Sequence, residues 1–122
     1  MGLDIRISRA KPIYCPHCGE LVTYRAVDTV DGGGSSWYEF LESIGYYKPY
    51  VKGQPYSQPM YGKDMELSNE QINKLEKFVT ESDLCTSYEM VKTLHLIESA
   101  RIDGDKIVIN ADWWGLNYVT RS

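Results

Sequence analysis

The sequence lacks long apolar runs and an excess of positive charge. No stretch approaches the roughly 20 apolar residues of a membrane-spanning helix. The opening residues, MGLDIRISRAKPIY, lack the apolar segment and cleavage pattern of a secretory signal. A net charge of −4 argues against general nucleic-acid binding, because that binding draws its affinity from neutralised phosphates. We therefore expect a cytoplasmic protein that does not enter membranes.

Cysteine is also scarce. Three cysteines in 122 residues are too few for a disulfide framework, and cytoplasmic thiols stay reduced. Two of them form the motif CPHCG, in which Cys15 and Cys18 can point at one ion and Gly19 lets the backbone turn. This motif resembles the zinc knuckle of zinc-ribbon and rubredoxin-like proteins, and the resemblance implies a bound zinc. A structural zinc needs four ligands, and the candidates to complete the set are His17, Cys85 and His95. His17 lies inside the motif and is expected to point away from the ion, so the set is Cys85 with His95, or one of them with an Asp or a water.

Two alternatives for these cysteines remain open. In the first, Cys15 and Cys18 bind no metal and are reduced thiols, one or both buried as small apolar side chains. In the second, Cys85 is a nucleophile at a helix start with His95 as its base. Ten residues of helix span about 15 Å, which disfavours that pair. A thioredoxin-like redox role is disfavoured as well, because a strand rather than a helix is expected after the CPHCG motif.

Catalytic signatures are absent from the sequence. It contains no G-x-S-x-G, no H-E-x-x-H and no P-loop. The segment DGGGSS precedes an expected helix but lacks the lysine of a P-loop, and Asp31 would repel a phosphate. We expect this segment to be a flexible turn into a capped helix. We therefore assign no catalytic residue from the sequence.

Aromatic residues are unevenly chosen: only two phenylalanines stand beside ten tyrosines and three tryptophans. The segment 46–62, YYKPYVKGQPYSQPMYG, has too much proline and glycine for a regular element and is too aromatic for a disordered linker. It predicts a long ordered loop, and such loops are usually functional. Tyrosine offers rigid contact area with a polar tip, although it also suits the rim of a small core. The expected partner-binding residues are Trp37, Tyr38, Tyr46, Tyr47, Tyr50, Tyr56 and Tyr61.

The length of 122 residues predicts one domain over residues 1–122. Two strands flank the CPHCG motif, so we expect an N-terminal knuckle hairpin within residues 1–30. The expected fold class is α+β, with an antiparallel sheet of about three to four strands and about three helices on one face. The expected strands are 2–8, 20–27, 63–67 and 106–111, and the expected helices are 36–45, 68–82 and 86–100.

Helix signals supply further detail. Capping boxes are expected at the start of the first helix, from Ser36 and Glu39, and of the second, from Ser68 and Gln71. In the third helix the spacing predicts an inward face. That face comprises Met90, Val91, Leu94 and Ile97. The two tryptophans of DWWGLNYVTRS predict a tail that is docked on the body.

Larger blocks of the sequence carry a second resemblance. The blocks GGGSSWYEFLESIGYYKPY and YGKDMEL, with CPHCGE before them and DGDKIVINADW after them, are similar to small uncharacterised proteins of gut bacteria and their prophages. The resemblance implies an accessory role in a mobile element, exerted by binding a host or phage macromolecule.

Three functions are compatible with the sequence. The preferred hypothesis is a non-catalytic protein that binds a protein partner through the tyrosine-rich loop. The alternative is a small-molecule enzyme or sensor whose pocket the loop walls, with His95, Cys85 or Asp112 inside. A weaker alternative is nucleic-acid binding through stacking tyrosines and an N-terminal basic patch. That patch comprises Arg6, Arg9, Lys11 and Arg25.

Overall fold

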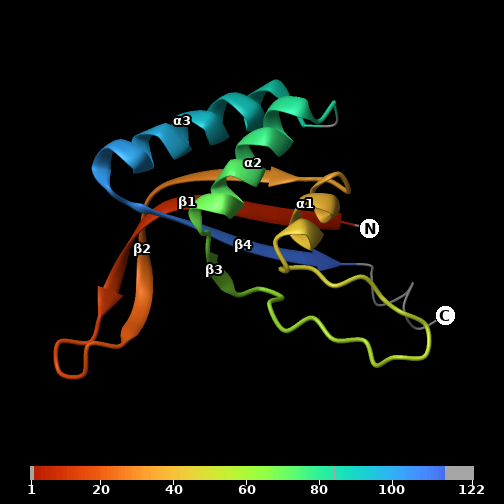
Figure 1. The fold of residues 1–122 in the computed structure, drawn as a ribbon, viewed down its shortest axis with the longest axis horizontal. Helices are drawn as coiled ribbons and strands as arrows, with labels where there is room; N and C mark the ends of the chain where they lie inside the picture. The colour runs from red at the N-terminus through yellow and green to blue at the C-terminus, as the bar shows by residue number, and fades with distance from the viewer. Residues whose placement is uncertain (1, 84, 115–122) are drawn as a thin grey trace.

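The computed structural model describes residues 2–83 and 85–114, which form one antiparallel sheet with helices on one face (Figure 1). The four strands lie in the order β2-β1-β4-β3, and three helices accompany them, so the expected α+β class is confirmed. None of the helices in the described ranges has the length and apolar character that a bilayer span requires. The elements are β1 (Gly2–Tyr14), β2 (Leu21–Gly33), α1 (Trp37–Ser43), β3 (Asp64–Glu66), α2 (Asn69–Glu81), α3 (Ser87–Asp103) and β4 (Lys106–Trp114).

The core lies between the sheet and the helices. In β1 the residues Leu3, Ile5 and Ile7 are buried, while the intervening Asp4 and Arg6 are exposed on the other face. This period of two places the apolar side chains under the helices and leaves the opposite face polar. From β4 the core receives Ile107, Ile109, Ala111 and Trp113.

Of the two capping boxes expected from the sequence, one is present and one is absent. The Ser68–Gln71 capping box of α2 is confirmed, and Thr86 and Glu89 form a second one at α3. The capping box expected at α1 is wrong, because Ser36 has helical backbone angles and makes no side-chain cap bond. The first N–H groups of α1 instead donate to backbone carbonyls, Trp37 to Gly34 at 3.1 Å and Tyr38 to Ser35 at 3.2 Å.

The inward face of α3 differs from the sequence prediction. Val91 was expected inside but is 58% exposed, whereas the polar Glu89 and Thr93 are buried. Met90 and Leu94 are only partly buried against the core. The buried stripe is therefore rotated about the helix axis relative to the predicted one. The prediction failed because hydrophobic periodicity assigns polar residues to the outer face. The buried residues of α3 are Glu89, Thr93, Leu96, Ile97 and Ala100.

Glu89 joins three elements through its buried carboxylate. Its Oε2 accepts hydrogen bonds from the indole N–H of Trp37 at 2.9 Å and from the backbone N–H of Gly33 at 3.1 Å. Its Oε1 accepts one from the backbone N–H of Thr86 at 2.9 Å. A buried carboxylate is tolerated only where donors satisfy it, and here β2, α1 and the start of α3 each supply one.

Two glycines allow this close approach. A Cβ on Gly32 would lie 2.6 Å from the Oε2 of Glu89, and one on Gly33 would lie 2.7 Å from the carbonyl oxygen of Leu3. Residues 32 and 33 were expected to belong to a flexible turn, but strand β2 continues through both of them. Glycine is needed at both positions because a side chain there would clash with these neighbouring atoms.

The hairpin of β1 and β2 extends beyond the rest of the sheet. β1 pairs with β4 only as far as Ala10, and its last residues pair with β2 alone. Pro12 is tolerated there because β1 is an edge strand beyond that point. We call this two-stranded extension, residues 11–14 and 21–25, the ribbon; it projects away from the body with the CPHCG turn at its tip (Figure 1).

We predict that Glu89→Ala lowers the free energy of unfolding by about 2 to 4 kcal/mol, because it leaves buried N–H donors of Trp37 and Gly33 without an acceptor. The matched control is Glu98→Ala, which removes an exposed carboxylate from the same helix and is expected to change stability little. Urea unfolding of both variants measures the difference. Equal stability losses in the two variants would contradict the role given to Glu89.

A second prediction concerns pH. Burial by itself raises the pKa of Glu89, but hydrogen bonds from Thr86, Trp37 and Gly33 together outweigh it and hold the pKa below its usual 4.5. A lowered pKa in the folded state stabilises the fold above the unfolded pKa, and the contribution is lost as pH falls through the folded pKa. The stability gap between the wild type and Glu89→Gln should therefore narrow below pH 4.5. In urea titrations from pH 7 to about pH 3, a constant gap would refute this assignment.

Candidate functional site

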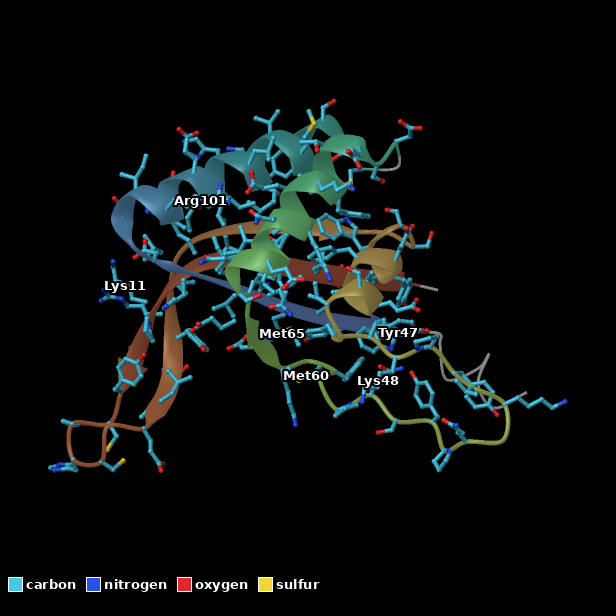
Figure 2. The ribbon with its side chains drawn as sticks, viewed as in Figure 1. Lys11, Tyr47, Lys48, Met60, Met65 and Arg101 are labelled. Atoms are coloured by element: carbon cyan, nitrogen blue, oxygen red, sulfur yellow. The ribbon has the colours of Figure 1, made fainter. Side chains whose placement is uncertain are left out.

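Two segments project from the body: the ribbon and the tyrosine-rich loop (Figures 1 and 2). We call residues 47–61 of this loop the tyrosine lobe. The lobe begins just after α1 and ends just before β3, so its two ends come from neighbouring parts of the core. Tyr47 and Lys48 lie where the chain leaves the body, and Met60 lies where it returns (Figure 2).

Hydrogen bonds close the base of the lobe. The backbone N–H of Lys48 donates to the side-chain oxygen of Gln58 at 3.0 Å, and the Gln58 amide group donates back to the Lys48 carbonyl. Just outside the lobe, the hydroxyl of Tyr46 donates to the Lys63 carbonyl at 2.6 Å and accepts from the Ala111 N–H at 2.9 Å. Both ends of the lobe are thereby tied to each other and to β4.

An aromatic cluster supports the lobe from beneath. Trp113 of β4 receives Tyr61 edge-on, with ring centroids 4.8 Å apart, and Tyr47 with centroids 5.4 Å apart. Tyr38 and Tyr46 also contact the Trp113 ring. Edge-to-face pairs of this kind stabilise beyond their buried area, by about 0.5 to 1.5 kcal/mol each. The lobe therefore rests on a packed aromatic base.

The structure removes two residues from the expected contact surface. Trp37 is 1% exposed and Tyr46 is 0% exposed, so neither reaches a partner. Both are amphipathic side chains whose polar atoms bind inside the protein, Trp37 to Glu89 and Tyr46 to the backbone. Sequence spacing shows that such residues cluster but not which end of the side chain meets water.

The remaining tyrosines divide by exposure. Tyr50 is 48% exposed and Tyr61 is 47% exposed, whereas Tyr38, Tyr47 and Tyr56 are half-buried. Burial raises the pKa of Tyr38 to about 12, so its phenol stays protonated at physiological pH. Burial also raises the pKa of Tyr47. These phenols provide contact area and are unsuited to proton transfer near neutral pH.

The CPHCG turn at the tip of the ribbon, which we call the knuckle after its sequence motif, is closed by backbone hydrogen bonds. The N–H of Cys15 donates to the Glu20 carbonyl at 2.8 Å, and the N–H of Gly19 donates to the Cys15 carbonyl at 2.9 Å. Gly19 has the left-handed φ of +74° that this turn requires. Hydrogen bonds from the backbone of Cys18 and then of His17, together with the Cys18 thiol, lower the pKa of Cys15. A lowered pKa favours the thiolate, which is the form of cysteine that binds metals.

Cys85 and His95 do not join the knuckle. Cys85 packs against the core just before α3, and His95 is exposed on that helix, while the knuckle lies at the far end of the ribbon (Figure 1). Within residues 2–83 and 85–114, no three His, Cys, Asp or Glu side chains gather as a metal site. One chain therefore does not assemble the four expected zinc ligands from these residues. Burial also raises the pKa of Cys85, which disfavours it as a nucleophile.

The expected basic patch is largely neutralised. Arg9 pairs with Asp103 and, at 3.2 Å, with Asp105, while Lys11 pairs with Asp105 at 2.5 Å. Arg6 pairs with Asp31 at 3.3 Å. Three of the four cations of the patch therefore have a carboxylate partner, which reduces the positive potential available to a phosphate backbone.

The sheet separates the residues that were expected to line a small-molecule pocket. Asp112 lines a hollow of about 390 Å³ on the uncovered face, together with Asp4 and Asp31. His95 and Cys85 lie on or beside α3, which covers the other face. The three side chains proposed for that pocket do not converge.

Sequence reasoning missed Gln58, which closes the base of the lobe. No local signal marks it, because its partner Lys48 is ten residues away in an irregular segment. The tail was expected to dock; Trp113 is buried, and residues 115–122 lie outside the described ranges.

We predict that Gln58→Ala raises amide hydrogen exchange in residues 49–57 by about tenfold, since two net hydrogen bonds contribute roughly 1.4 kcal/mol or more. The melting temperature should change little, because the bonds lie outside the core. The control is Gln54→Ala, which alters an exposed amide within the lobe. Exchange that rises equally in both variants would show that Gln58 has no special role.

Comparison with known proteins adds no relative: no protein-family model matches the chain, and no curated protein or solved structure is significantly similar to it.

Proposed function

We propose that the chain is a non-catalytic binding protein whose tyrosine lobe grips an acidic surface of a protein partner. The observation that carries this proposal is the exposure of Tyr50, Val51 and Tyr61 on a loop whose base is closed by hydrogen bonds. A pre-formed loop loses little conformational entropy on binding, and exposed tyrosines add rigid amphipathic contact area.

Charge supports an acidic partner. Between Ser43 and Lys63 the sequence contains three lysines and no acidic residue, a local charge of +3 in a chain of −4, so the rest carries −7. The lysines are Lys48, Lys52 and Lys63. A positive lobe on a negative body attracts acidic surfaces and repels basic ones, which favours one orientation of approach.

The shape of the lobe favours a protein partner over a metabolite. Pro49, Tyr50, Pro55 and Tyr56 help to line a hollow of about 190 Å³. Pockets for drug-sized ligands usually exceed about 300 Å³ and bury most of the ligand. The smaller hollow suits a single side chain inserted from a partner surface.

We also propose a cellular setting and a genetic origin for this protein. The resemblance to prophage proteins supports an accessory role in a mobile element, with a host or phage protein in the cytoplasm as the target. Nucleic-acid binding is the less favoured reading, because most cations of the N-terminal patch already pair with carboxylates.

We predict that Tyr50→Ala weakens partner capture at least tenfold, because buried interface aromatics commonly contribute more than about 1.4 kcal/mol. The control is Tyr88→Ala, which removes a 58% exposed tyrosine from α3, away from the lobe. Capture from nuclease-treated lysate of the native host, quantified by mass spectrometry, compares the two variants with the wild type.

A charge-reversed variant sharpens this test. Lys48→Glu with Lys52→Glu should abolish capture of the same acidic protein, whereas Lys92→Glu on α3 should not. Retained capture by Tyr50→Ala, or capture that disappears after nuclease treatment, would overturn the proposed function.

A further inference from the structure

The knuckle presents half of a metal site at an accessible position. Cys15 and Cys18 lie at the tip of the ribbon, and Cys18 and the two residues between them are exposed. The body of the protein does not cover this tip, which is the outermost point of the ribbon (Figure 1). A second molecule can therefore approach both sulfurs.

The backbone of the turn orients the sulfur of Cys15. The backbone N–H groups of His17 and Cys18 point at the sulfur of Cys15, and the left-handed Gly19 closes the turn. Metal-binding side chains are typically oriented by hydrogen bonds of this kind from the surrounding backbone. Thiolates select zinc among the common divalent cations, whereas calcium and magnesium prefer oxygen.

Within the described part of the chain the ligand set stops at two. No third His, Cys, Asp or Glu joins Cys15 and Cys18, and even the adjacent His17 does not complete a group. A structural zinc takes four protein ligands in a tetrahedron. The missing pair must come from elsewhere, and a second knuckle supplies the same two thiolates in the same geometry.

We propose that two copies of the chain meet tip to tip and share one zinc ion, bound by Cys15 and Cys18 of each copy. The arrangement is a two-fold symmetric dimer, in which the same patch of each molecule contacts its equivalent. Four thiols lose their protons as four zinc–sulfur bonds form, so the step needs no oxidant or reductant.

The flanks of the knuckle supply a second, independent observation. Four apolar side chains beside it are between 42% and 66% exposed, although the ribbon is far from the core. They are Ile13, Tyr14, Leu21 and Val22. Apolar residues gathered on a projecting tip favour contact with another surface, and the facing ribbon of a second copy covers them with like residues.

The ribbon also gains stability from such a bridge. Beyond Ala10 its two strands pair only with each other, and an isolated pair of strands is marginally stable in water. A zinc at the tip fixes the turn that joins both strands, and contacts across the dimer shield the apolar side chains. The ribbon amides should therefore exchange hydrogen more slowly in the zinc-bound dimer.

The test uses the full chain in a phosphine reductant, first freed of metal by a chelator and then titrated with zinc alone. Elemental analysis should find one zinc for two chains, and light scattering should show the mass rise from 14.0 kDa to twice that value. Chelator should return the protein to the monomer. Hydrogen exchange of residues 11–14 and 21–25 should slow in the zinc-bound form.

Two variants separate the knuckle from the third cysteine. Cys18→Ser should lose zinc binding and remain a monomer, while its metal-free melting temperature should equal that of the metal-free wild type, because the tip lies outside the core. Cys85→Ser should bind one zinc for two chains and form the dimer, since Cys85 is distant from the knuckle.

Three results would overturn the inference. One zinc on each monomeric chain would show that a single molecule completes the site. A dimer that persists in chelator would show that zinc does not hold the copies together. No zinc binding at all would show that the knuckle is a turn without a metal. Each result leaves the tyrosine-lobe proposal standing, because partner capture is measured separately.

Discussion

The buried carboxylate of Glu89 is the interaction on which the rest of the structure depends. It lies beneath the junction where β2 ends, α1 begins and α3 is capped, and it accepts an N–H from each of these parts. Gly32 has no side chain because that carboxylate occupies the space. The position of α1 determines where the chain enters the tyrosine lobe, so the placement of the lobe follows from one charge and its donors.

The two projecting segments are held in different ways. The lobe is packed against Trp113 and closed by side-chain hydrogen bonds at its base, so its exposed tyrosines belong to an ordered surface. The ribbon is held mainly by the pairing of its own two strands, with Lys11 paired to Asp105 at its base, and it leaves apolar side chains uncovered. Tyr24 joins it to the body by a hydrogen bond to Glu66 of β3 at 3.2 Å, which links the two outer strands of the sheet. One segment is a closed loop packed on an aromatic base, and the other is a strand pair that exposes apolar side chains.

Local patterns predicted most of the fold. The alternation in β1, the knuckle as a hairpin turn, the Ser68 capping box and the short strand at Asp64–Glu66 all rest on residues close in sequence. The failures have a shared cause. Glu89 is polar and was not among the residues expected on the inward face of α3, and the glycines before α1 were expected to form a flexible turn. Each is explained by an atom from a distant element, which hydrophobic periodicity does not register.

The sequence by itself determined the class of the fold, the position of the knuckle and the existence of an aromatic, proline-rich loop, because these depend on backbone propensity and spacing. Only the tertiary structure decided which aromatic side chains face outward. Tyr46 and Trp37 lie inside because they form hydrogen bonds with β4 and α3. It also separated Cys85 and His95 from the knuckle by placing α3 over the sheet and the knuckle beyond its end. Ligand sets and contact surfaces are properties of distances between elements, and those distances arise only when the whole core packs.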